Sequence, residues 1–139
     1  MAWPVDPKWG ISCKYGKKGP MWKSGWHQGV DFPVTPGTPV RAPMPGTVIG
    51  VGNVWGAAFG HHQVVVQVGK NLYVIFAHMK EFDVKAGQVV KTGDLLGRSA
   101  AEGNVAGPHL HMEVQDHRLW QSGHAINPNF VLDYKPKGK

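Results

Sequence analysis

The sequence contains one cysteine, Cys13, among its 139 residues. A single cysteine excludes a disulfide within the chain, so the fold must be held by a buried core, and a chain of this length can form one without a structural metal. No neighbour of Cys13 in the sequence would lower the pKa of its thiol. We therefore expect a buried or inert thiol rather than a nucleophile or a metal ligand.

Long apolar runs are also absent. No stretch approaches the ~20 apolar residues that a membrane-spanning helix requires. The start, MAWPVDPKWG, lacks the charged and apolar regions of a secretory signal peptide. We therefore expect no signal peptide and no membrane insertion, and we also expect a monomer.

Acidic residues are few: the sequence has 9 Asp and Glu and 15 Lys and Arg, which gives a net charge of +6. Such an excess favours a polyanionic partner. Nucleic acid is not favoured, because the basic residues are scattered or lie in the C-terminal KPKGK, without a basic helix or an aromatic RNA-binding motif. Anionic polymers of a cell wall would attract this charge equally well.

Glycine and proline are abundant by contrast, with 19 and 11 residues, and they fall between short apolar runs. This pattern is typical of brief strands joined by tight turns, and no stretch of ten or more residues has helical periodicity. We predict an all-β fold with a compact antiparallel sheet or sandwich as its core. The expected strands are residues 46–52, 62–68, 72–79, 93–99 and 109–114.

The connections between these strands are short. The turn GKN is expected to join residues 62–68 and 72–79 as a hairpin. No linker divides the chain, so we expect residues 1–139 to form one domain. Residues 1–25 are expected to be an irregular lead-in, and residues 135–139 a flexible basic tail.

Two segments carry closely spaced histidines. In WHQGVDF, His27 and Asp31 are four residues apart, which directs both side chains to one face of an extended segment, and Gly29 between them allows the backbone to bend. In GPHLHMEV, His109 and His111 share one face, while the apolar residues that alternate with them turn toward a core. Each pair therefore presents its side chains to a common target.

These side chains match the donor set of a catalytic zinc site, which uses imidazole nitrogen and carboxylate oxygen from three protein ligands and keeps a fourth position open. His27, Asp31 and either His109 or His111 would suffice. The other histidine of that pair would then be left to transfer protons, together with His78, which ends the apolar segment YVIFAHMK. A hydrolase needs such additional histidines, whereas a purely structural site does not.

Glu113 shares the face of His111 and could act as a general base. We expect it instead to accept a hydrogen bond from a ligand histidine, or to be exposed. Four further histidines have polar or loop surroundings and no partner at ligand spacing, and we expect solvated or structural roles for them: His61, His62, His117 and His124.

In order along the chain, HQGVDF, FAHM and GPHLHMEV resemble the motif set of the LytM/lysostaphin-type zinc metallopeptidases, peptidase family M23, over about residues 22–132. The resemblance implies one Zn²⁺, short loops that form a substrate groove over one sheet, and hydrolysis of peptide bonds in bacterial peptidoglycan. Carried over by position, it implies His27, Asp31 and His111 as zinc ligands, and His78 and His109 as catalytic histidines. FAHM has Phe where the family often has Tyr, and HMEV has Met where Phe is common, but both changes preserve apolar packing.

The function that we expect is a zinc metalloendopeptidase that cleaves the cross-links or stem peptides of peptidoglycan. His109 is favoured as general base, and His78 as the group that stabilises the oxyanion or protonates the leaving amine, although the residue types alone also allow the reverse. Glycine bridges and the D-alanyl bond to a diamino acid are both compatible with the sequence as the bond cleaved.

The setting of this activity follows from a second resemblance. The lead-in CKYGKKGPMWKSGWHQGVDF and the short chain resemble the peptidase domains of phage endolysins, which implies action on the cell wall after release by a holin. A virion-associated enzyme or an exported domain is an alternative. Two other functions are alternatives. One is a catalytically silent wall-binding or regulatory module, and the other is a phosphohistidine carrier, which would not use Asp31 as a ligand.

Overall fold

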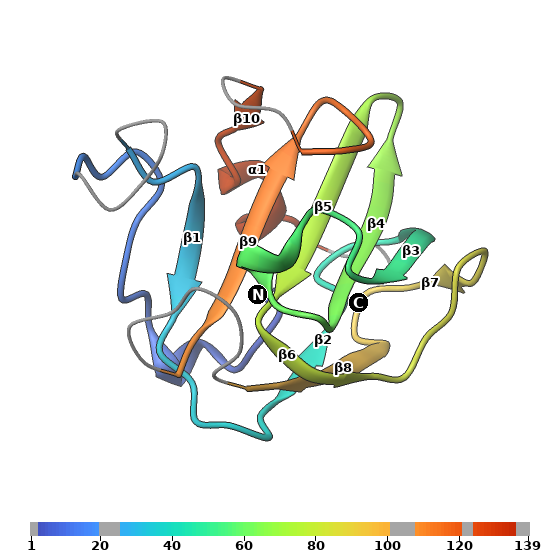
Figure 1. Cartoon of the computed structure of the whole chain (residues 1–139), viewed down its shortest axis with the longest axis horizontal. Coiled ribbons are helices and arrows are strands. Elements are labelled where there is room, and N and C mark those ends of the chain that lie inside the picture. Colours follow the sequence, from blue (N-terminus) through green and yellow to red (C-terminus); the bar gives the residue numbers. More distant parts are fainter. Residues whose placement is uncertain (1–2, 20–25, 101–107, 121–123, 136–139) are drawn as a thin grey trace.

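The computed structural model describes residues 3–19, 26–100, 108–120 and 124–135, and in it two antiparallel sheets form the fold (Figure 1). The larger sheet has the order β1-β9-β5-β4-β3-β7, and β10 also pairs with β9. The smaller sheet has the order β2-β8-β6. The all-β prediction is therefore confirmed.

The strands of the larger sheet are β1 (Gly29–Phe32), β3 (Gly46–Gly52), β4 (Gln63–Gly69), β5 (Leu72–Ala77), β7 (Val89–Val90), β9 (Leu110–Gln115) and β10 (Ala125–Ile126). Those of the smaller sheet are β2 (Pro39–Arg41), β6 (Met79–Phe82) and β8 (Leu95–Ser99). The predicted strand over residues 46–52 coincides with β3. The predicted hairpin is formed by β4 and β5, and Asn71 in its turn has a φ of 55°, as tight hairpin turns require.

Helices are short. They are the 3-10 turns η1 (Pro7–Trp9) and η2 (Ala57–Phe59) and the four-residue helix α1 (Asn129–Leu132). Across the described ranges no helix is long and apolar enough to cross a bilayer. The described part of the lead-in, residues 3–19, contains η1 and is less irregular than expected, because Cys13 forms an antiparallel bridge with Asp31 and Lys18 one with Trp26. The basic tail beyond Lys135 lies outside the described residues.

The main core lies between the two sheets and is built from alternate residues of the strands. In β9, Leu110, Met112 and Val114 are all 0% exposed and belong to this core. Buried residues of β2 and β8 pack on it, as do Val131 and Leu132 of α1. Since side chains alternate along a strand, His111, Glu113 and Gln115 project to the opposite face of the larger sheet.

That opposite face has a smaller apolar cluster of its own. Trp55, Val65, Ile75 and Ala77 form its buried part, and partly buried side chains such as Phe59 and Trp120 pack against them. The larger sheet is thus covered on both faces, which explains why every residue of β9 is buried, polar ones included. A polar side chain on this strand must find its hydrogen-bond partners within the protein.

Substitution of Phe76 tests whether the main core packs as described. It is 1% exposed and pairs with Met112 across β5 and β9. Phe76→Ala should lower the free energy of unfolding by about 3–5 kcal/mol, because it removes a large buried side chain and leaves a cavity. The matched control, Val89→Ala at a residue that is 73% exposed, should change it by less than about 0.5 kcal/mol. Urea unfolding followed by circular dichroism measures both, and equal losses would contradict this core.

Candidate functional site

Three histidines surround the carboxylate of Asp31. The pairing of β1 with β9 sets Asp31 directly across from His111, and the Nδ1–H of His111 donates to Oδ1 of Asp31 at 2.8 Å. Nε2 of His27 lies 3.4 Å from Oδ2 of Asp31, and Nε2 of His109 lies 3.7 Å from Oδ1. The structure thus brings together four of the five site residues predicted from the sequence, from two segments about 80 residues apart.

The fifth, His78, lies between β5 and β6 and has a φ of 62°, which is unusual for a residue other than glycine. Its backbone is held on both sides, because its N–H donates to the carbonyl of Phe59 and its carbonyl accepts from the N–H of Ala100, each at 2.9 Å. Its ring centroid lies 5.0 Å from that of His109 and 6.2 Å from that of His111. His78 is 4% exposed and therefore forms an inner wall of the site.

Gly29 has a role different from the predicted one. It lies within β1 rather than at a bend, and it pairs with Glu113. A Cβ at this position would lie 2.6 Å from Cε1 of His111 and 2.6 Å from the carbonyl oxygen of Met112. Glycine is therefore needed because the ring of His111 lies against the backbone of β1, and the predicted bend was wrong.

A chain of hydrogen bonds continues from His111 along β9. The Nε2–H of His111 donates to Oε1 of Glu113 at 2.9 Å, and Nε2 of Gln115 donates to Oε2 of Glu113 at 2.7 Å. Glu113 is 2% exposed, so the expectation of simple exposure was wrong, and the role of hydrogen-bond acceptor for His111 agrees with the geometry. Gln115 was missed from the sequence, although it continues the alternation of His111 and Glu113.

The charges of this network stabilise one another. Burial alone would lower the pKa of His111, but hydrogen bonds to Asp31 and Glu113 outweigh it and raise this pKa to about 10. Burial alone would raise the pKa of Asp31, but hydrogen bonds from His111 and His27 hold it well below its usual range. A pKa of about 10 keeps His111 protonated at neutral pH in the metal-free protein, between Asp31 and Glu113.

The donor atoms suit a divalent metal such as zinc. The Nδ1–H of His27 lies 3.1 Å from the carbonyl oxygen of Lys14, which fixes its tautomer and leaves Nε2 facing Asp31. In the same way Glu113 holds Nε2 of His111 and leaves Nδ1 facing Asp31. Both imidazoles are thus held by a further hydrogen bond and turn their other nitrogen toward the carboxylate of Asp31, a donor set that zinc accepts once the Nδ1 proton of His111 is lost.

Cys13 lies beside this site, which the sequence did not indicate. Its sulfur and the donor atoms of His27 and Asp31 are all within 4.8 Å of one another. Burial, together with the charge of Asp31, raises the pKa of the Cys13 thiol. The raised pKa disfavours the thiolate that a nucleophile needs, while the closeness of Cys13 to His27 and Asp31 differs from the expectation that it has no place among possible ligands.

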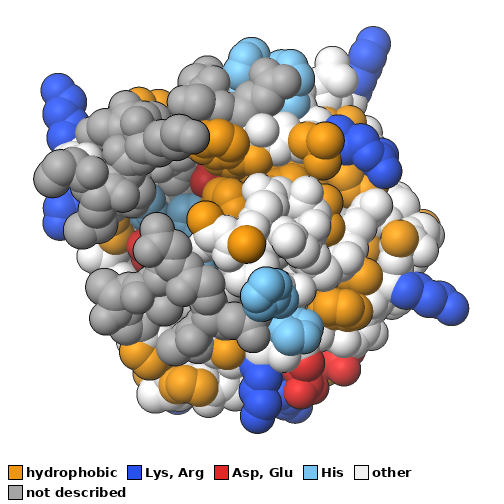
Figure 2. Space-filling model, in the orientation of Figure 1, with side chains coloured by type: hydrophobic (Ala, Val, Ile, Leu, Met, Phe, Trp, Pro, Cys, Tyr) orange, Lys and Arg blue, Asp and Glu red, His pale blue; other side chains and the backbone are white. Residues whose placement is uncertain are grey.

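The surroundings of the site are partly visible from outside. Figure 2 shows histidine and acidic side chains recessed over β1 and β9. The ring of Phe59, from the apolar cluster on this face, lies 5.7 Å from that of His111. His109 is the more exposed of the two histidines predicted to act on protons, with 17% of its side chain accessible, so an entering molecule can reach it.

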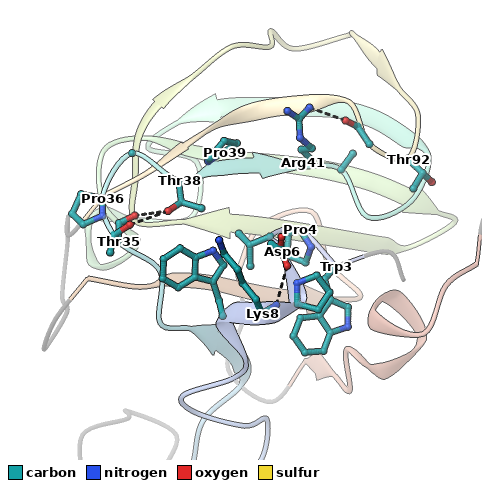
Figure 3. A pocket seen from close by; sticks show the side chains of 16 residues that line it. Trp3, Pro4, Asp6, Lys8, Thr35, Pro36, Thr38, Pro39, Arg41 and Thr92 are labelled. Atoms are coloured by element: carbon teal, nitrogen blue, oxygen red, sulfur yellow. Dashed lines mark hydrogen bonds between the residues drawn. The ribbon is translucent and has the colours of Figure 1, made fainter.

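A separate cleft of about 710 Å³ lies between the lead-in and the β2 region (Figure 3). Its lining includes Trp3, Lys8, Thr38 and Arg41. None of the five predicted site residues lines it. The cleft and the histidine site are therefore different places on the molecule.

The remaining histidines divide into two groups. His61 is exposed and His62 half-buried, in loop surroundings as expected. For His117 and His124, the expectation that no partner lies at ligand spacing was wrong, because both rings contact Asp116. The partnership of His124 was hidden because eight residues separate it from Asp116 in the sequence.

Comparison with known proteins gives consistent matches. A family model described as peptidase family M23 matches residues 25–128. An uncharacterized metalloprotease of Haemophilus influenzae is 41% identical over 102 residues, which cover 73% of this chain and 20% of that protein. The peptidoglycan DD-endopeptidase ShyA of Vibrio cholerae is 36% identical over 115 residues, which cover 81% of this chain and 26% of that protein.

Among solved structures, the catalytic domain of the antimicrobial peptidase lysostaphin from Staphylococcus simulans matches with a TM-score of 0.78 and 27% identity. This match covers 91% of this chain and 94% of that domain. The chain is thus similar in extent to a catalytic domain. The matched residues cover only 20% and 26% of the two curated relatives named above.

The network around Asp31 predicts how the stability of the metal-free protein depends on pH. The pKa of Asp31 is lowered on folding, so its contribution is present above the unfolded value near 3.8 and is lost as the pH falls further. The pKa of His111 is raised, so its contribution is full below the unfolded value of 6.5 and is lost as the pH rises toward about 10. Stability should therefore be greatest between about pH 4 and 6.5.

Urea unfolding in the presence of a chelator, from pH 3 to pH 10, measures this profile. His111→Gln should remove the decline on the alkaline side. If this variant and the parent protein lost stability equally between pH 7 and pH 10, the charged state of His111 described above would be wrong.

Proposed function

Because the chain belongs to peptidase family M23, we propose that it is a zinc metalloendopeptidase domain that hydrolyses peptide bonds in bacterial peptidoglycan. The observation that carries this proposal is the convergence of three imidazoles on the carboxylate of Asp31, with the ring of His78 beside them. The similarity to a peptidoglycan DD-endopeptidase and to the catalytic domain of lysostaphin supports it.

The proposed ligands of a single zinc ion are His27, Asp31 and His111. His27 and His111 each turn one ring nitrogen toward Asp31 while the other ring nitrogen is held by Lys14 or Glu113. When bound, zinc supplies a Lewis acid that polarises the scissile carbonyl and makes a water molecule easier to deprotonate. Glu113 and Gln115 keep His111 in the orientation that this ligand role needs.

His109 and His78 are the proposed catalytic residues. His109 has the partly exposed ring next to Asp31, so it is placed to take a proton from the attacking water. His78 is buried, and its backbone is held at a positive φ that keeps its ring 5.0 Å from that of His109. A buried and fixed imidazole suits the stabilisation of the developing oxyanion or the protonation of the leaving amine.

The proposed substrate is a peptide of the wall, either a stem peptide or a cross-link, bound in a groove over the face of the larger sheet that carries the site. The relatives named as peptidoglycan endopeptidases support this choice. The net charge of +6 would attract anionic wall polymers to the enzyme. As a finer proposal, residues 1–139 act as one monomeric domain at the cell wall, in the manner of a phage endolysin released by a holin.

Two variants test the division between ligands and proton-transfer groups. His111→Ala should lose the zinc equivalent held with His27 and Asp31, and with it the hydrolysis of peptidoglycan. His109→Ala should keep that zinc and lower turnover by about 100-fold or more, because only proton transfer is impaired. Zinc content by mass spectrometry and release of new amino termini from purified peptidoglycan measure the two effects.

His61→Gln is the matched control, because it removes an exposed histidine that is neither a proposed ligand nor a proposed catalytic residue, and it should keep both zinc and activity. Circular dichroism confirms that each variant is folded. A His109→Ala enzyme that digested walls at the parental rate would contradict the proposed role of this residue.

The substrate class is tested by digestion of purified peptidoglycans of known bridge chemistry, with and without a chelator. New amino termini should appear only without the chelator, and their identity defines the bond cleaved. Binding to the wall without any new amino terminus, with zinc present, would support the catalytically silent wall-binding module instead.

A further inference from the structure

A second cluster of metal-binding side chains lies where β9 leaves the larger sheet. Asp116 follows β9 directly, and its Oδ1 accepts hydrogen bonds from Nδ1 of His117 at 2.7 Å and from Nδ1 of His124 at 3.1 Å. One donor atom from each residue lies within 4.8 Å of the others. Two imidazoles and a carboxylate thus meet at one point outside the site described above.

The backbone keeps these three residues together. The N–H of Asp116 donates to the carbonyl of His124 at 3.3 Å, next to the pairing of β10 with β9. The carbonyl of Arg118 accepts a hydrogen bond of 2.8 Å from the indole of Trp55, which belongs to the apolar cluster of the site face. The backbone of Asp116, Arg118 and His124 is therefore held by hydrogen bonds within the described residues.

The arrangement of the two rings also suits a shared ligand. Their centroids are 4.1 Å apart with a T-shaped orientation, and both direct Nδ1 at the same carboxylate oxygen. The side chains are 42% exposed at His117, 39% at His124 and 43% at Asp116, so an ion can enter from solvent and keep water in its remaining positions. Two histidines and one carboxylate are a donor set for zinc and similar transition metals.

We propose that Asp116, His117 and His124 form a second binding site for a divalent transition metal. It lies roughly 16 Å along β9 from His111, from the strand rise per residue, so the ion it binds takes no part in hydrolysis. The bound ion joins the segment that leaves β9 to the segment that enters β10. Through Arg118 and Trp55 it also strengthens the packing on the face that carries the proposed zinc site.

The test uses the full chain and zinc alone as the probe, with calorimetric titration after removal of all metal. The parent protein should bind two equivalents. His124→Gln should bind one, because the second equivalent is weakened at least tenfold by loss of a ligand. His61→Gln, which removes an exposed histidine that belongs to neither cluster, should still bind two. Two equivalents in His124→Gln would overturn the proposal, as would a parent protein and His124→Gln that bind the same number.

His111→Ala separates this proposal from the proposed function. It should lose the equivalent held with His27 and Asp31 and keep the equivalent at Asp116, where amide signals of residues 116–118 and 124–125 should shift on zinc addition in ¹H–¹⁵N spectra. If His111→Ala keeps two equivalents, the proposed catalytic site fails and the second site stands. If zinc shifts none of these amide signals, the second site fails and Asp116 only hydrogen-bonds two histidines.

A second readout is thermal unfolding. At saturating zinc the melting temperature of the parent protein should exceed that of His124→Gln by on the order of 5 °C, while the two should agree within about 1 °C in chelator. Circular dichroism at 20 °C checks that both fold. An equal response of both proteins to zinc would contradict a site at His124.

Discussion

The register between β1 and β9 is the constraint on which the site depends. It sets Asp31 across from His111, and the same backbone pairing brings His27 and His109 to the two oxygens of the carboxylate. A shift of one residue would turn Asp31 to the other face of the sheet and oppose it to an apolar residue. Gly29 protects this register, because any side chain there would collide with the ring of His111.

The network also explains how a sheet that is covered on both faces tolerates charged groups. Asp31, His111 and Glu113 are removed from water, which is costly for each of them alone. Their alternating charges and the amide of Gln115 offset that cost as long as all partners are present. Two carboxylates around one imidazole leave excess negative charge, so a divalent cation held by the same donors complements the site.

Much of the sheet and of the candidate site was predictable from the local sequence pattern. The alternation of His109 to Val114 and the apolar runs of β3, β4 and β5 indicated an antiparallel sheet with a polar face, and the donor types indicated a metal. Very short strands, such as the two-residue β7 and β10, have too few residues to show an alternation of apolar and polar side chains. They form because longer neighbouring strands offer backbone hydrogen bonds. The contacts of Gly29, Gln115 and His124 depend on partners distant in sequence, which spacing alone does not reveal.

Regular and irregular backbone contribute differently to the site. Asp31 and His111 lie in paired strands, where the ladder of hydrogen bonds fixes their separation. His78 lies between two strands in a conformation that costs energy, and it is held there by the backbone of Phe59 and Ala100. The position of His78 can therefore change through its loop contacts while Asp31 and His111 stay in place. At the other end of β9, the carbonyl of Arg118 likewise accepts a hydrogen bond from the indole of Trp55, so the segment after the strand is held by a contact distant in sequence.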